Sequence, residues 1–158
     1  MSLLRALRTL GLKTILSAAL ALEREIFDLY SSLKTEPAGG EIPPSLARIL
    51  DEEAGHQHLI RDVIDGRIEE LELEAMLAAK ELHVHHPGEI EALSADRYGP
   101  LLERLETILE KEKEIHSLFA GLHRKAKIPF VRRVFRFLEE QERAHVLVLE
   151  RLLGRGEN

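Results

Sequence analysis

Apolar residues recur along four stretches of the chain at alternating steps of three and four residues, the period of an amphipathic helix. The stretches run from Leu12 to Leu33, from Leu46 to Val63, from Leu101 to Leu122 and from Val131 to Leu152. Leu, Ala, Glu and Arg, which favour helix, dominate the composition. The pattern therefore predicts an all-α protein built from four long helices.

Proline and glycine mark where these helices begin and end. Pro43 and Pro44 close a turn-rich segment and are tolerated only at or before the first turn of the second helix. Gly121 and Pro129 bracket a second short connection, and Gly154 follows the last helix. Connections this short join helices into antiparallel hairpins.

We expect a single domain over residues 1–158, with one hairpin at 12–66, a crossover at 67–97 and a second hairpin at 98–153. The crossover contains a helix-like stretch, IEELELEAMLAAKEL, followed by HVHHPGE, which is predicted to be a loop. A connection of this length permits the chain to cross between the hairpins. The expected architecture is a four-helix bundle with one crossover between helices 2 and 3.

Each apolar stretch is interrupted by polar residues at positions that should face the core. Burying an unpaired carboxylate costs several kcal/mol, so a set of such interruptions needs a common explanation. The residues are Glu23, Glu53, His56, Glu112, Glu142 and His145.

The spacing of these residues repeats. Glu23 precedes Glu53 by 30 residues, Glu112 precedes Glu142 by 30, and a histidine follows the second glutamate of each pair by three. An offset of 89 residues maps the first hairpin on the second with the apolar positions in register, so that Tyr30 falls on Phe119. This is the pattern expected of a duplicated hairpin with one pseudo-symmetric centre.

A Glu-x-x-His pair places both side chains on one helical face, one turn apart. Two such pairs and a glutamate from each of the other helices would bring four carboxylates and two imidazoles together. Four negative charges neutralise two divalent cations, and this donor set suits iron or manganese, with zinc as an alternative occupant. The other explanation is a bundle whose polar core residues pair with each other and bind no metal.

The order Glu, Glu-x-x-His, Glu, Glu-x-x-His over two hairpins resembles the ferritin-like di-iron carboxylate superfamily. ALEREIFDLY, DEEAGH, ILEKEKEIHSLF and EEQERAH are most similar to the rubrerythrin-type di-iron domain, over roughly residues 12 to 153. The resemblance implies a ferritin-like bundle that binds two iron ions. The ligands it implies are terminal Glu23 and Glu112, bridging Glu53 and Glu142, and one imidazole per metal from His56 and His145.

The resemblance also implies a catalytic part for Tyr30, which would lie beside the ligands. The chain departs from rubrerythrins at two points. They usually carry an extra carboxylate three residues from the glutamate of the third helix, where this chain has Leu109 and Ile115 around Glu112. The chain also has no cysteine and hence no rubredoxin-like centre, so electrons are expected to come from a separate donor protein.

Four functions are compatible with such a site. The resemblance favours a rubrerythrin-like peroxidase or oxidase that reduces hydrogen peroxide or dioxygen in oxidative-stress defence, which we expect to be a homodimer. The alternatives are a ferroxidase that handles or stores iron, a dimanganese catalase, and a non-catalytic metal-binding bundle. The size of the assembly would separate iron storage from the enzyme.

Charge and hydropathy narrow the choice of partners. The formal net charge of -6 argues against binding to nucleic acid or to an anionic membrane surface. The apolar run from Met1 to Leu22 loosely mimics a signal peptide, but Lys13 and Thr14 interrupt it and it leads directly into the first helix. We therefore expect no cleaved signal peptide. No segment approaches the ~18–20 unbroken apolar residues that a membrane span needs, so we expect no span, and a cysteine-free chain suits the cytoplasm.

Other ionisable residues lie near the predicted site. His116 is expected to be a partly buried helix residue, with a role as ligand or proton donor as the alternative. A cluster in the crossover is expected to be solvated or to touch a neighbouring subunit, with a surface metal site as the alternative: His83, His85 and His86. Several glutamates that flank the ligands are expected to point away from the core and to pair with arginines: Glu25, Glu52, Glu110, Glu114, Glu139 and Glu140.

Overall fold

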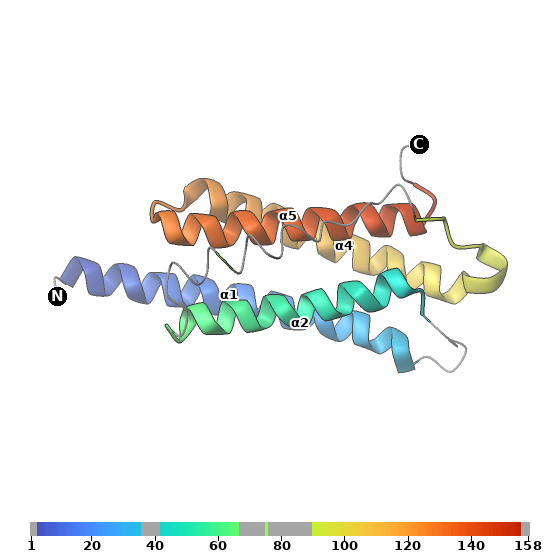
Figure 1. Ribbon diagram of the computed structural model, residues 1–158, viewed down its shortest axis with the longest axis horizontal. Coiled ribbons are helices and arrows are strands. Elements are labelled where there is room, and N and C mark those ends of the chain that lie inside the picture. The colour runs from blue at the N-terminus through green and yellow to red at the C-terminus, as the bar shows by residue number, and fades with distance from the viewer. Residues whose placement is uncertain (1–2, 36–41, 67–74, 76–89, 156–158) are drawn as a thin grey trace.

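The computed structural model describes residues 3–35, 42–66, 75 and 90–155, and four long helices make up its architecture. They are α1 (Leu3–Ser32), continued by the short 3-10 helix η1 (Leu33–Thr35), then α2 (Pro44–Ile64), α4 (Ala95–Lys125) and α5 (Pro129–Leu152). Figure 1 shows α1 with α2 as one antiparallel hairpin and α4 with α5 as the other. The predicted all-α fold of two hairpins is confirmed.

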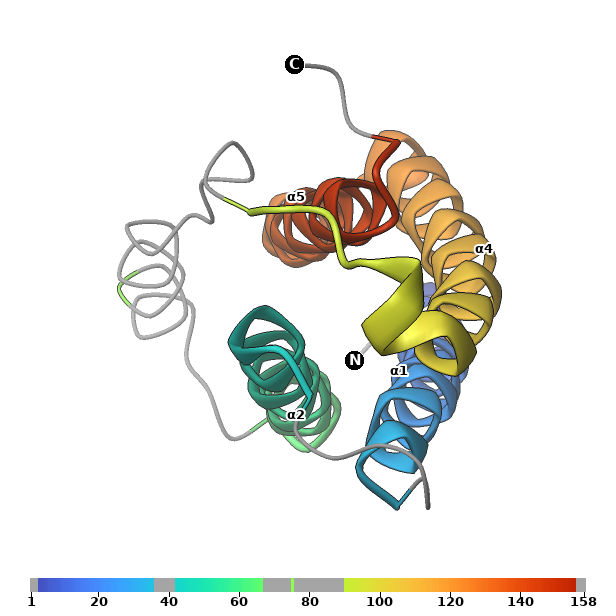
Figure 2. The same ribbon diagram turned by 90° about the vertical axis from the view of Figure 1, so that its right-hand side faces the viewer.

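Viewed end-on, the four helices stand at the corners of a bundle, with the helices of each hairpin adjacent (Figure 2). Within a hairpin the two helices pack on each other more extensively than on the other hairpin. Helices α2 and α4 run in the same direction (Figure 1), so the chain crosses from one end of the bundle to the other between them. This is the ferritin-like topology. The helix and loop predicted at 68–82 and 83–89 lie outside the described residues, apart from Ala75.

The helix boundaries follow local chemistry. Pro44 and Pro129 occupy the first turns of α2 and α5, where a missing amide hydrogen costs no hydrogen bond. The connection between α4 and α5 is shorter than predicted, because α4 runs through Gly121 and ends only at Lys125. A glycine inside a helix costs about 1 kcal/mol relative to alanine, which the packing of a long helix can offset.

Two helices also begin earlier than the hydrophobic pattern indicated. Helix α1 starts at Leu3, so the apolar run at its beginning is continuous with the helix that carries Glu23. Helix α4 starts at Ala95, where the Ser94 hydroxyl accepts a hydrogen bond from the backbone N–H of Arg97 at 3.3 Å. The first turn bends at Tyr98 (φ -123, ψ 22), because Pro100 removes a helix hydrogen bond and crowds the preceding turn.

The four apolar stripes meet in one core. Its largest fully buried side chains are aromatic, and each large apolar side chain removed from water contributes about 1.5–3 kcal/mol to stability. These aromatic residues are Tyr30, Phe119, Phe135 and Phe137. None of the helices among the described residues carries an apolar stretch of the length that a bilayer requires.

Candidate metal centre

The apolar stripes bring the six predicted polar residues to the same level of the core. Glu23 comes from α1 and Glu112 from α4, while α2 and α5 each supply a glutamate and the histidine one turn later. All six are at most 2 % exposed. Gln57, at 8 %, is the other buried polar residue among those described. The buried positions predicted from the periodicity are therefore confirmed: Glu23, Glu53, His56, Glu112, Glu142 and His145.

The six side chains form two overlapping groups whose oxygen and nitrogen atoms lie within 4.8 Å of one another. Each group contains four residues, and Glu53 and Glu142 belong to both. The first group adds Glu23 and His56, and the second adds Glu112 and His145. Two carboxylates shared between two sets of ligand atoms is the arrangement that a dinuclear site with bridging carboxylates needs.

Each histidine points its Nδ1 atom at three carboxylates. His56 Nδ1 lies 3.1 Å from Glu142 Oε1, 3.4 Å from Glu53 Oε2 and 3.6 Å from Glu23 Oε2.

The same pattern recurs around His145 in the second half of the cluster. His145 Nδ1 lies 2.7 Å from Glu53 Oε1, 3.5 Å from Glu142 Oε2 and 3.6 Å from Glu112 Oε1. The two imidazole rings stack with their centroids 5.6 Å apart. The geometry reproduces the internal repeat, because each histidine is nearest to the glutamate of the opposite Glu-x-x-His helix.

Glu23 and Glu112, the outer glutamates that each belong to only one group, have strongly raised pKa values. Burial is the largest cause for both Glu23 and Glu112, followed by the charges of Glu142 and Glu53, all of which disfavour the ionised carboxylate. Without a metal ion, these two carboxyl groups hold their protons well above the usual range.

The shared glutamates and the histidines ionise instead. Burial acts to raise the pKa of Glu53 and Glu142, but contacts with the neighbouring carboxyl groups and with the histidines outweigh it and lower both pKa values. Burial acts to lower the pKa of His56 and His145, but the carboxylates around them raise both. In the metal-free core these shifts favour imidazolium beside carboxylate at the two histidines and protonated carboxyl groups at Glu23 and Glu112.

The donor atoms fit a pair of divalent cations. Within the described part of the chain, six buried side-chain atoms of the cluster have no hydrogen-bond partner: Glu23 Oε1 and Oε2, Glu53 Oε2, His56 Nε2, Glu112 Oε2 and Glu142 Oε2. Buried polar atoms are normally satisfied, and these are oxygen and imidazole donors of the kind iron and manganese bind. The buried clusters are consistent with a dinuclear metal site.

Tyr30 lies beside this cluster, as the resemblance implied. Its hydroxyl donates a 2.8 Å hydrogen bond to Glu112 Oε1 in the core. Burial and the charge of Glu112 raise the pKa of the Tyr30 hydroxyl well above its usual value. The hydroxyl therefore stays protonated and orients the Glu112 carboxyl group.

One flanking glutamate pairs with an arginine as predicted, but the predicted direction of its side chain was wrong. Glu52 does not point away from the core: its Oε2 atom lies 2.8 Å from His145 Nε2, and Arg48 Nε lies 3.4 Å from its Oε1. The helical pattern places Glu52 at the margin of the stripe, and the reach of its side chain across to α5 depends on how closely the two helices approach. A glutamate directly before a predicted ligand was the available signal.

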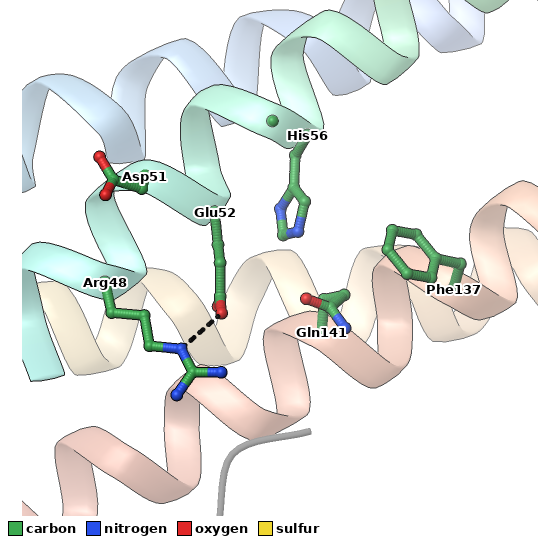
Figure 3. Close-up of a pocket in the computed structure, with 7 residues that line it drawn as sticks. Arg48, Asp51, Glu52, His56, Phe137 and Gln141 are labelled. Atoms are coloured by element: carbon green, nitrogen blue, oxygen red, sulfur yellow. Dashed lines mark ion pairs between the residues drawn. The ribbon is translucent and has the colours of Figure 1, made fainter. Parts of the chain in front are cut away.

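A pocket of about 340 Å³ opens between α2 and α5 at this level. It is lined by Arg48, Asp51, Glu52, Gly55, His56, Phe137 and Gln141. Figure 3 shows the His56 ring reaching from α2 toward Gln141 and Phe137 on α5. His56 forms part of the wall of this pocket, although it is only 2 % exposed.

The remaining flanking glutamates point away from the cluster and pair on the surface, mostly with lysine rather than arginine. Glu139 is paired with His123, whose Nδ1 lies 2.8 Å from its Oε2. His116 is half-buried on α4 and belongs to neither group of candidate ligands among the described residues. The histidines of the crossover lie outside the described residues: His83, His85 and His86.

A sequence model of the rubrerythrin family matches residues 14–153, which span both hairpins and all the candidate ligands. Neither a curated protein nor a solved structure matches the chain.

Proposed function

The chain belongs to the rubrerythrin family, and from that premise we propose that it is a non-haem di-iron oxidoreductase that reduces hydrogen peroxide or dioxygen. The observation that supports this most is the pair of buried Glu/His groups that share Glu53 and Glu142. Two metal ions held by common carboxylates can act on both oxygen atoms of one small substrate.

In this proposal the six residues would hold two metal ions, each by one of the two overlapping groups of four ligands. Glu53 and Glu142 would be shared by both metals, Glu23 and His56 would complete the donors of one position, and Glu112 and His145 those of the other. When bound, two iron ions would supply electrons and Lewis acidity for breaking the O–O bond. Reduction of one peroxide to two waters consumes two electrons and two protons, so an external electron donor protein must restore the reduced state.

The chain's own residues prepare the site for this chemistry. The surrounding core keeps bulk water away from the carboxylates, which strengthens their interaction with cations. Tyr30 holds the Glu112 carboxyl group in one orientation, because its protonated hydroxyl donates to Oε1 at 2.8 Å. The pocket over His56 offers a path from solvent that suits a substrate as small as hydrogen peroxide.

We also propose that the protein works as a homodimer in the cytoplasm and takes part in oxidative-stress defence. Neither nucleic acid nor a membrane surface is expected as a partner, because the net charge of -6 repels polyanions.

The first test is metal content, measured by elemental analysis on protein expressed with iron and manganese both available. About two equivalents per chain are expected. The reduced, loaded protein is then mixed with hydrogen peroxide, and peroxide consumption and metal oxidation are followed together. If the metal is oxidised in proportion to the peroxide consumed, and the reaction repeats after a chemical reductant is added, the result supports a peroxidase.

A matched pair of variants on α5 controls this assay. Glu142→Ala removes a shared ligand and should abolish metal binding and turnover, whereas Glu140→Ala removes an exposed glutamate paired with Arg136 and should change neither. Oxygen release without a reductant would point to a catalase, and consumption of dioxygen by a shell-sized particle to a ferroxidase. A loaded protein inert to both oxidants would overturn the proposed activity.

A further inference from the structure

The two halves of the candidate centre are equivalent in their ligands but not in the residues that support those ligands. Glu112 and His145 each have a hydrogen-bonding neighbour outside the ligand set, namely Tyr30 and Glu52. The internal repeat of 89 residues identifies the counterparts of these neighbours on the other half. They are Phe119 in place of Tyr30 and Gln141 in place of Glu52.

Phe119 cannot replace the tyrosine hydroxyl. Its ring is fully buried and stacks on Phe135 at a centroid distance of 6.2 Å. Among the described residues, no hydrogen-bond partner reaches either oxygen of Glu23, whereas Oε1 of Glu112 accepts from Tyr30. The carboxyl group of Glu23 is therefore less restrained than that of its counterpart.

Gln141 does not replace the carboxylate either. It lines the pocket over His56, yet His56 Nε2 has no partner within the described part of the chain. By contrast, His145 Nε2 lies 2.8 Å from Glu52 Oε2, and Arg48 holds Glu52 from the other side. A neutral amide would also be a weaker acceptor than a carboxylate if it rotated into contact.

These contacts bear directly on metal affinity. With Nδ1 of His145 turned toward the carboxylate cluster, its Nε2–H donates to Glu52, which fixes the tautomer and makes Nδ1 a stronger electron donor. Loss of such an outer partner typically lowers metal affinity about 10- to 100-fold. Both supporting residues act on the same half of the centre.

We propose that the two metal positions are unequal: the position of Glu112 and His145 binds first and more tightly, and the position of Glu23 and His56 is the exchangeable one that faces the pocket. This inference rests on the proposed function, in that it requires two bound metals. Glu52 and Tyr30 act in it as positioning residues for His145 and Glu112. The pocket over His56 is then the side from which the second metal enters and leaves.

The test is an anaerobic titration of the metal-free full chain with Co²⁺, followed by absorption and by proton NMR of the hyperfine-shifted ring N–H signals. We expect two resolved binding steps. The first should bring a ring N–H signal that exchanges slowly with water, from His145 held by Glu52. The second should bring a faster-exchanging signal, from His56 at the pocket.

Substitutions on the two halves should move these steps in opposite directions. Glu52→Gln should weaken the first step about 10- to 100-fold and speed exchange of its N–H signal. Gln141→Glu should tighten the second step and slow exchange of the second signal. Tyr30→Phe should weaken only the first step, without changing N–H exchange at His145.

Glu140→Gln is the matched control, because it breaks an Arg–Glu pair of the same i, i+4 kind that touches no histidine. It should leave both steps unchanged.

The outcomes separate this inference from the proposed function. Two Co²⁺ ions that bind with equal affinity, or a Glu52→Gln effect no larger than that of Glu140→Gln, would overturn the inequality while leaving the dinuclear site intact. If the first ion instead brings the fast-exchanging N–H signal, the tighter position is that of His56, and the proposed order of binding is overturned as well. Failure of the parent protein to bind Co²⁺ would overturn the dinuclear site itself.

Discussion

His145 Nδ1 lies 2.7 Å from Glu53 Oε1, which joins the second Glu-x-x-His helix to the first across the bundle. His56 is related in the same way to Glu142, at 3.1 Å. In the metal-free protein these contacts pair imidazolium with carboxylate, while Glu23 and Glu112 remain protonated. Protons therefore occupy the core in place of cations.

Metal binding should accordingly release protons. The pKa values of Glu23, Glu112, His56 and His145 are all raised, so protons compete with a metal ion for these groups up to a higher pH than usual. Affinity should rise with pH. Calorimetric titrations with Fe²⁺ or Co²⁺ in buffers of different ionisation enthalpy would count the protons, and a pH-independent affinity with no proton release would contradict this prediction.

The stability of the metal-free protein should fall as pH rises. A group whose pKa is raised on folding contributes stability that is complete below its unfolded-state pKa and is lost as pH rises through its folded-state pKa. For Glu23 and Glu112 this loss of stability begins above pH 4.5, and for His56 and His145 it begins above pH 6.5.

Glu53 and Glu142, whose pKa values are lowered, act in the opposite sense and lose their contribution as pH falls. Thermal unfolding with a chelator should therefore show greatest stability in mildly acidic solution, and loaded protein should not lose stability toward alkaline pH. A metal-free melting temperature that climbs steadily from neutral to alkaline pH would be inconsistent with this.

Substitution of Glu53 should remove more metal from the protein than substitution of Glu23. Glu53→Ala removes a side chain that belongs to both groups of ligand atoms, so both metals should be lost. Glu23→Ala touches one group, so about one equivalent should remain. Elemental analysis of the two purified variants, with helix content checked by circular dichroism, measures the difference, and equal metal loss from both would argue against shared carboxylates.

Glu23→Leu should stabilise the metal-free protein. Both carboxyl oxygens of Glu23 are buried and make no hydrogen bond of normal length and angle among the described residues. Replacing such a group by an apolar side chain of similar size recovers about 1–3 kcal/mol, less what its contact with Glu53 contributes. Urea unfolding in the presence of a chelator would measure this gain.

Glu25→Leu on the same helix is the control for that measurement, because Glu25 is exposed and pairs with Lys111. Its effect should stay within about 0.5 kcal/mol. A Glu23→Leu variant less stable than this control would mean that the buried carboxyl group stabilises the fold by itself.

The sequence alone was enough for the helices, the hairpins and the six buried polar residues. Helical period decides which residues share a face, and a repeat at a fixed offset of 89 residues aligns the faces of the two hairpins. Glu53 and His56 could be paired with Glu142 and His145 in this way, because the constraint acts within each helix and is then duplicated.

Helix ends were less predictable. The start of α4 depends on the Ser94 hydroxyl and on the bend before Pro100, and neither has a periodic signature. Gly121 looked like a helix terminator and is an interior residue of α4, because packing of the long helix outweighs the low helix propensity of one glycine.

The tertiary structure alone decided what surrounds the six residues. Whether Glu52 turns to solvent or to His145 depends on the distance between α2 and α5, which no single-helix pattern contains. The same distance opens the pocket over His56. A sequence repeat constrains the positions that must match between two halves of a bundle, whereas the contacts that make the halves differ arise only when side chains from separate helices come within hydrogen-bonding reach.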